Sequence, residues 1–319
     1  MRAVVLLAVV AGCGQQTSPP TQNPPAKTSV TPAKPAKPIP PPVYSIGDHS
    51  ETIDENKVSR TYIVKVPTGY DGKRQLPLVM LLHGWTGSAK LVEVYTGMGK
   101  EADKDGFLLV VPDGLGKPQG WNCGFLNLGG KDSDDVKFLT DVLDAVGKKV
   151  KVDPRRVYVA GHSNGAMMAY VLGAKLSNRV AAIGVVSGTI GFDQGEKIAH
   201  VDPPTQPVSA IIVHGLLDPT VPYNHGAALL QNCTSAPDSA AFWAKADGIT
   251  TNPTVTTAAK GNLEQRDWKL GSIEVKLISI ANGTHDWPGG VNWEGPEATT
   301  GFNAAQQLWG FFAAHRKSG

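Results

Sequence analysis

Short runs of valine, leucine and isoleucine recur along most of this chain, and stretches rich in helix-forming residues separate them. Such near-continuous apolar runs are typical of strands in a parallel sheet whose two faces are covered by helices. The predicted strands are 59–67, 76–84, 106–114, 155–163, 180–188, 209–218 and 273–285, and the predicted helices are 88–105, 134–150, 165–178, 224–231, 238–247 and 300–315. The alternation predicts an α/β fold with a doubly wound, mostly parallel sheet, in which active sites lie beyond the carboxyl ends of the strands.

The segment VYVAGHSNGAMMAYVLG, residues 157–173, contains the pattern G-x-S-x-G at 161–165. The pattern alone arises easily by chance in a chain with 36 glycines, but here a predicted strand precedes it and a predicted helix follows it. That context is the setting of a nucleophile elbow, where two glycines permit a tight turn that lifts the serine hydroxyl clear of the sheet. We therefore expect Ser163 to be a nucleophile, and the alternative is a serine in a structural turn.

A nucleophilic serine needs a histidine to take its proton and a carboxylate to orient that histidine. Asp218 and His285 each follow a predicted strand, which places them at the same sheet edge as Ser163, and the chain order is that of α/β-hydrolases. Asp218 also precedes Pro219, and an Asp-Pro step is common in ordinary turns. The rival acids and histidines weighed against these two are Asp193, Asp202, His200, His214, His225 and His315.

Attack by a serine on a carbonyl group creates an oxyanion, which needs two backbone N–H donors. One donor is expected from Asn164, the residue after the nucleophile. The second is expected from the loop after the strand at 76–84, where Trp85 follows His83-Gly84. We expect the backbone of this loop to supply the N–H donor and the His83 side chain to have a structural role.

The N-terminus has the character of an export signal, since Arg2 is followed by the apolar run AVVLLAVVAG, which ends at Cys13 and is far too short to span a bilayer. VAGC resembles the lipobox of bacterial lipoproteins, in which the cysteine is acylated. We therefore expect a lipoprotein-type signal peptide at 1–13 with lipidation of Cys13, a Pro-rich tether at 14–42 and one domain at 43–319. The alternative is a secretory signal cleaved elsewhere.

Charge and cysteine content narrow the function classes. The formal net charge of +2 gives no indication of nucleic-acid binding. In an exported protein, the remaining pair Cys123 and Cys233 favours a possible disulfide over a metal site. The acids Asp132, Asp134 and Asp135 stand where a helix is predicted to begin, and acids are favoured in a first turn, so we interpret them as structural rather than as a metal or glycosidase site.

Several blocks of this sequence resemble the esterase family that groups polyhydroxybutyrate depolymerases with feruloyl and acetylxylan esterases. The blocks, which together cover about residues 58–312, are RTYIVKVPTGYDGKRQLPLVMLLHG, VVPDGLG…GWN, DDVKFLTDVLD, VDPRRVYVAGHSNGAMMAY, VHGLLDPTVPY and THDWPGG. The resemblance implies an α/β-hydrolase fold and a mechanism that needs no metal or cofactor. It also implies roles for five residues: nucleophile Ser163, base His285, orienting carboxylate Asp218, and oxyanion-hole amides from Trp85 and Asn164.

The sequence departs from the family pattern at three places. Trp85 stands where members usually carry Cys or another small residue, and Asp286 replaces the usual Thr of an HTWPGG block. A cysteine often seen near 246–248 is absent, while Cys233 occurs in a neighbouring loop. These departures concern substrate specificity rather than chemistry.

Three tryptophans, Trp121, Trp287 and Trp293, follow predicted strands and are expected to line the mouth of the site, where aromatic walls suit a phenolic acyl group or a sugar face. The alternative is that they pack loops onto the sheet. The resulting expectation is a monomeric serine esterase, extracellular or lipid-anchored to a bacterial membrane, acting on feruloyl or acetyl esters of plant polysaccharide. The alternatives are a polyhydroxybutyrate depolymerase, a serine peptidase and a non-catalytic ligand-binding surface lipoprotein.

Overall fold

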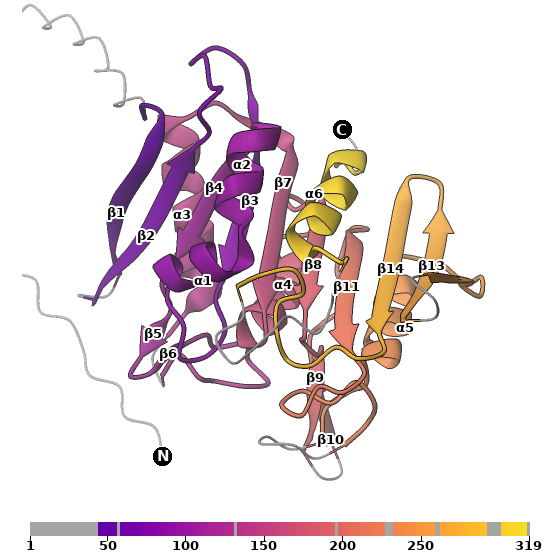
Figure 1. The fold of residues 1–319 in the computed structure, drawn as a ribbon. Helices are drawn as coiled ribbons and strands as arrows, with labels where there is room; N and C mark the ends of the chain where they lie inside the picture. Colours follow the sequence, from indigo (N-terminus) through magenta and orange to yellow (C-terminus); the bar gives the residue numbers. More distant parts are fainter. Residues whose placement is uncertain are drawn as a thin grey trace, which may run out of the picture. The chain divides into compact units, whose positions relative to one another are not determined.

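A computed structural model describes residues 44–55, 58–130, 133–194, 197–226, 232–258, 262–291 and 301–317 (Figure 1). The predicted signal peptide with Cys13, the predicted tether, Asp132 and Trp293 lie outside these residues. Among the helices that are described, none combines the length and the apolar character needed to cross a membrane.

The described residues form a ten-stranded sheet in the order β1-β2-β4-β3-β7-β8-β11-β14-β13-β12 (Figure 1). In that order, the strands are β1 (Gly47–Glu55), β2 (Val58–Val66), β4 (Leu108–Pro112), β3 (Leu76–Leu82), β7 (Val152–His162), β8 (Ala182–Val186), β11 (Ser209–Gly215), β14 (Ile273–Ile280), β13 (Leu263–Leu270) and β12 (Thr254–Ala258). The strands from β4 to β14 pair in parallel, and both edges of the sheet are antiparallel. The prediction of a mostly parallel sheet is confirmed.

Helices cover both faces of this sheet. They are α1 (Ala89–Thr96), α2 (Met98–Asp105), α3 (Asp135–Lys149), α4 (Asn164–Lys175), α5 (Ala236–Ala246) and α6 (Ala304–Ala314). Helices α3, α4 and α5 lie on one face of the sheet, and α1, α2 and α6 lie on the other (Figure 1). The side chains of each group of helices contribute to a separate buried cluster. Along β3, Leu78 and Met80 point into the first cluster and Val79 and Leu81 into the second, as the alternation of side chains along a strand requires.

The structure differs from the prediction at the sheet edges and in two helices. The antiparallel edge strands β1, β12 and β13 were not predicted, because they are partly or wholly exposed and lack continuous apolar runs. The short pairs β5 (Leu115–Gly116) with β6 (Gln119–Gly120), and β9 (Gly191–Gln194) with β10 (Lys197–His200), were not predicted either.

The predicted helix at 88–105 is two helices, because Gly97 adopts a left-handed conformation with φ 72° that ends α1 and precedes α2. Residues 224–226 of the predicted helix at 224–231 are not helical, and the rest of that prediction falls outside the described residues.

Candidate active site

Ser163 lies in a sharp turn between β7 and α4. Its backbone has φ 55° and ψ −121°, a conformation that costs a non-glycine residue on the order of 1–3 kcal/mol and is found at functional sites. A Cβ on Gly165 would meet the backbone carbonyl oxygens of Leu82 and His83, and a Cβ on Gly161 would meet the backbone of Gly165. Both glycines of the pattern are therefore required by close backbone approach, as a nucleophile elbow demands.

A chain of hydrogen bonds links three residues that each follow a parallel strand. His285 Nε2 lies 2.9 Å from Ser163 Oγ, and His285 Nδ1 lies 2.8 Å from Asp218 Oδ2. The other carboxylate oxygen of Asp218 accepts the backbone N–H groups of Thr220 and Val221, both at 2.8 Å. The structure thus brings together the three residues that the sequence predicts as nucleophile, base and orienting carboxylate.

The Asp218 carboxyl is buried but remains ionised. Burial raises its pKa, but the hydrogen bonds from His214 and His285 and the electrostatic interaction with these two residues outweigh burial and hold the pKa well below its usual range. Because an ionised carboxylate only accepts, His285 Nδ1 carries its proton, and Nε2 is free to accept the hydroxyl proton of Ser163. This is the tautomer that a general base needs.

The loop after β3 lies directly against the nucleophile, since a Cβ on Gly84 would lie 3.3 Å from Ser163 Cβ. His83 is buried beside it: Nε2 accepts the Gly114 N–H at 2.9 Å, so Nδ1 carries the proton and donates to the Gly84 carbonyl at 2.8 Å. That carbonyl belongs to the same trans peptide as the Trp85 N–H, and the two groups point in opposite directions. The His83 ring therefore fixes the direction of the Trp85 amide, and burial lowers its pKa so that it stays neutral.

Asn164, the other predicted oxyanion donor, is the first residue of α4. The N–H groups of the first helical turn have no partner within their own helix, and they carry the positive end of the helix dipole. The amide after the nucleophile is therefore suited to a developing negative charge.

A cavity of about 440 Å³ opens over Ser163 and His285. Its wall is largely apolar and includes the side chains of Trp85, Trp287 and Val291. Trp85 is 48% exposed, so its ring stands in the mouth of the cavity. The volume is in the range of small-ligand sites.

Comparison with known proteins agrees with this geometry. Residues 60–203 match the model of the family described as esterase PHB depolymerase. Residues 60–203 therefore carry the sequence pattern of this esterase family. Feruloyl esterase B of Piromyces equi is 30% identical over 245 residues, which are 74% of this chain and 44% of that protein. A probable feruloyl esterase C of Aspergillus terreus is 28% identical over 179 residues, 54% of this chain and 60% of that protein.

The described domain also has the fold of a solved structure. An acetyl xylan esterase from Aspergillus awamori superposes with a TM-score of 0.59 at 16% identity, covering 83% of this chain and 99% of that one. This likeness confirms the predicted α/β-hydrolase fold. The chain spans less than two thirds of the length of the two feruloyl esterases named above.

The three tryptophans predicted to line the substrate site differ in where the structure places them. Trp287 lines the cavity, whereas Trp293 lies outside the described residues. Trp121 is fully buried and donates its indole N–H to the His83 carbonyl at 2.8 Å, so the prediction that it lines the mouth is wrong. The loop after β6 turns its ring inward against the His83 ring, a direction that sequence position does not reveal. Conversely, the Trp85 side chain, predicted only as a backbone donor, is part of the wall.

No role for His162, the residue before Ser163, was predicted from the sequence. Its Nε2 donates to the backbone carbonyl of His285 at 2.8 Å, and its Nδ1 accepts from the Tyr95 hydroxyl at 3.1 Å. Burial, with the neighbouring His285, lowers its pKa to about 3, so it stays neutral. It therefore holds the backbone of the loop that carries the base. Its position next to Ser163 within the G-x-S-x-G pattern was the one feature of the sequence that could have indicated this role.

The possible disulfide between Cys123 and Cys233 is not formed, since both cysteines are free and buried. The Cys123 thiol contacts the backbone carbonyl and side-chain amide of Asn164, and the Cys233 thiol donates to the Pro222 carbonyl at 3.6 Å. Burial raises the pKa of both thiols, that of Cys233 to about 11.

The rival residues lie elsewhere, with one exception. Asp202 pairs with Lys175 at the surface, His225 pairs with Asp238, and His315 contacts Phe311 at the end of α6, while Asp193 and His200 belong to the β9–β10 pair. His214 does reach the site, where Nε2 lies 3.4 Å from Asp218 Oδ2 and donates to the Val221 carbonyl at 2.8 Å.

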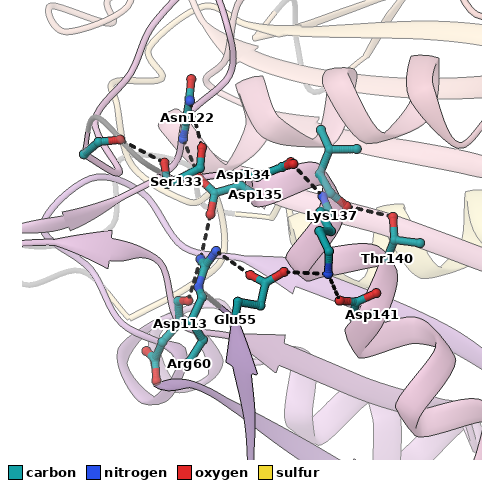
Figure 2. Close-up of polar contacts among 12 residues, drawn as sticks. Glu55, Arg60, Asp113, Asn122, Ser133, Asp134, Asp135, Lys137, Thr140 and Asp141 are labelled. Atoms are coloured by element: carbon teal, nitrogen blue, oxygen red, sulfur yellow. Dashed lines mark hydrogen bonds and ion pairs between the residues drawn. The ribbon is translucent and has the colours of Figure 1, made fainter. Parts of the chain in front are cut away.

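The acids at the start of α3 have structural partners. Asp134 caps the helix by accepting the Lys137 N–H at 3.0 Å, and Asp135 forms an ion pair with Arg60 at 2.6 Å (Figure 2). The structural interpretation of these two acids is confirmed. Asp132 lies outside the described residues.

Proposed function

We propose that the protein is a carboxylic-ester hydrolase that works through a covalent acyl-enzyme on Ser163. The observation that supports this most directly is the hydrogen-bond chain from Asp218 through His285 to Ser163 at the floor of an apolar cavity. The family match and the esterase relatives support the same reaction class.

The first half-reaction makes the acyl-enzyme. His285 Nε2 takes the Ser163 hydroxyl proton as Oγ attacks the ester carbonyl carbon, and the carbonyl oxygen becomes an oxyanion held by the amides of Trp85 and Asn164. His285 then gives this proton to the alcohol oxygen as the bond between the acyl carbon and that oxygen breaks. The alcohol leaves, and the acyl group remains on Ser163.

The second half-reaction releases the acid. Water gives a proton to His285 and attacks the acyl carbon, the second oxyanion occupies the same two amides, and Ser163 Oγ leaves with the proton returned by His285. Asp218 stays ionised throughout, because its pKa is held low, and stabilises the imidazolium that forms at each step. No metal or cofactor takes part in this sequence.

We propose feruloyl or acetyl esters of plant polysaccharide as the substrate class. The aromatic wall formed by Trp85 and Trp287 suits a flat phenolic acyl group, and the relatives named above are feruloyl esterases. The second candidate is a polyester such as polyhydroxybutyrate. It is favoured by the family description and by the exposed apolar side chains of Leu216 and Leu217, which precede Asp218.

The test is hydrolysis of methyl ferulate, p-nitrophenyl acetate and butyrate, and a polyhydroxybutyrate suspension by the purified protein and its Ser163→Ala variant. Ser239→Ala is the matched control, because it removes a buried hydroxyl in α5, away from the triad. Turnover of methyl ferulate that only Ser163→Ala abolishes supports a feruloyl-type esterase, while clearing of the suspension moves the assignment to a depolymerase. Absence of turnover from folded protein contradicts the esterase proposal and leaves a non-catalytic binding role.

We also propose that the protein is exported and held at a bacterial membrane by a lipid on Cys13. Metabolic labelling with a radioactive fatty acid tests this, because the wild type should carry label and Cys13→Ser should not. Label on both proteins, or on neither, would contradict the anchor. We expect the released domain to be a monomer by light scattering.

A further inference from the structure

Trp121 hydrogen-bonds to His83, which lies two residues before the proposed oxyanion donor Trp85, and to the side chain of Asn164, the other proposed donor. Its indole N–H donates to the carbonyl of His83, two residues before Trp85, at 2.8 Å. Its backbone N–H donates to Asn164 Oδ1 at 2.7 Å, and its carbonyl accepts from Asn164 Nδ2 at 3.4 Å. Trp121 has no exposed surface and Asn164 is 1% exposed, so water does not compete for these bonds.

The segment before Trp121 holds the oxyanion loop from its other side. The Thr86 N–H donates to the Gln119 carbonyl at 2.9 Å. A Cβ on Gly120 would lie 3.0 Å from Cδ1 of Trp85, so this backbone packs against the Trp85 ring. The peptide that bears the Trp85 amide is therefore held before and after that residue by residues 119–121.

The same segment is fixed to the body of the domain by a buried ion pair. The backbone N–H of Asn122 donates to Asp135 Oδ2 at 2.7 Å, and Asp135 Oδ1 lies 2.6 Å from the Arg60 guanidinium (Figure 2). The side chains of Asp135 and Arg60 are 0% and 1% exposed. Successive amides at 121 and 122 are thus held by two different helices, through the first residue of α4 and the first residue of α3.

We propose that Trp121 is a positioning residue that sets the two oxyanion donors relative to each other. The two donors come from separate elements, the loop after β3 and the start of α4, and Trp121 hydrogen-bonds to His83 in the first and to Asn164 in the second. Oxyanion stabilisation depends on donors that are in place before the charge develops, and a misplacement of about 1 Å can cost about 100-fold in rate. This inference rests on the proposed function, since it concerns the oxyanion of that reaction.

The test is Trp121→Phe, which removes the indole N–H and keeps an aromatic ring. Trp243→Phe is the matched control: Trp243 in α5 is also fully buried, and its indole N–H donates to the Val208 carbonyl at 2.7 Å, away from the site. Both variants lose one buried hydrogen bond to a carbonyl and should lose similar thermal stability. Only Trp121→Phe should lower kcat, by about 10- to 100-fold, with KM within about twofold of wild type.

Two further measurements separate positioning from general loosening. The pH profile of kcat should keep its midpoint in Trp121→Phe, because the contacts of His285 with Asp218 and Ser163 are untouched. Amide hydrogen exchange of the peptide 83–87 should be faster in Trp121→Phe than in Trp243→Phe. Equal kcat in the two variants, a shifted pH midpoint, or unchanged exchange at 83–87 would overturn the inference.

The exchange measurement does not depend on turnover. If the wild type hydrolyses no ester, the proposed function fails on its own. Faster amide exchange at 83–87 in Trp121→Phe would then still support the inference that Trp121 fixes the conformation of this loop. Unchanged exchange would refute that inference.

Discussion

Replacing Asp218 by Asn tests whether the carboxylate acts by selecting the histidine tautomer. Asp218 Oδ1 accepts two backbone N–H groups, from Thr220 and Val221, and Oδ2 accepts the proton on His285 Nδ1. In the Asn variant, the amide oxygen must take the Oδ1 position, because an NH2 group there would face two donors. Each buried donor left unsatisfied costs about 1–3 kcal/mol, so the reverse orientation is unfavourable by about 2–6 kcal/mol.

The locked amide then presents its NH2 group to His285 Nδ1. That contact favours the tautomer with the proton on Nε2, which faces Ser163 Oγ and cannot accept its proton. The geometry of the site survives, but the resting base is lost. For the same substitution in the Ser-His-Asp triad of a serine protease kcat falls about 10⁴-fold, about 5 kcal/mol in barrier height, and we expect a similar loss here.

The assay is kcat for p-nitrophenyl acetate at pH 7–8, with circular dichroism to verify folding. The matched control is Asp247→Asn, which changes a buried carboxyl at the end of α5 that accepts the Val208 N–H at 3.0 Å and lies outside the triad. The control should retain wild-type kcat. If Asp218→Asn keeps more than about one hundredth of wild-type kcat, tautomer selection is not the role of the carboxylate.

Three further predictions concern stability. Because the folded-state pKa of His162 is lowered to about 3 by burial and by its histidine neighbour, the unfolded chain takes up the proton first as pH falls below about 6.5. The free energy of unfolding therefore falls as the pH is lowered. Measured by urea unfolding, its decrease between pH 7 and pH 5 should be smaller by about 2 kcal/mol in His162→Gln than in the wild type, and equal decreases in the two proteins would contradict this. Arg60→Met should lower the free energy of unfolding by about 3–5 kcal/mol, because it leaves the buried carboxylate of Asp135 without its ion pair. Adding Asp135→Asn should recover at least half of this loss. A double variant no more stable than Arg60→Met would refute the ion-pair argument. Gly165→Ala should lower stability by more than about 2 kcal/mol and also lower kcat, because its Cβ meets backbone carbonyls. Gly147→Ala, in open space on α3, should instead raise stability by about 0.5–1 kcal/mol. Thermal melting measures both changes.

Much of the central sheet could be predicted because its strands are buried on both faces and therefore read as continuous apolar runs. β3, β4, β8 and β11 are buried along their whole length, and β7 is buried at residues 157–161. The edge strands could not be predicted in this way, since β12 is exposed along its whole length and β1 alternates between partly and fully exposed positions. Their pairing depends on neighbours that are distant in the sequence.

The sequence by itself determined where the reactive side chains stand. A nucleophile elbow and residues that directly follow parallel strands are local features of the sequence. Because parallel strands bring their carboxyl ends to one sheet edge, Ser163, Asp218 and His285 could be placed together from the sequence alone.

Only the tertiary structure decided what surrounds those residues. Trp121 turns inward rather than toward substrate, His162 reaches the backbone of His285, and Cys123 lies against Asn164 instead of pairing with Cys233. Each outcome depends on which loop packs against which over separations of about 40 to 120 residues. The physical reason is that loop side chains follow no repeating period, so their directions are set by close packing and by the need to pair buried polar groups.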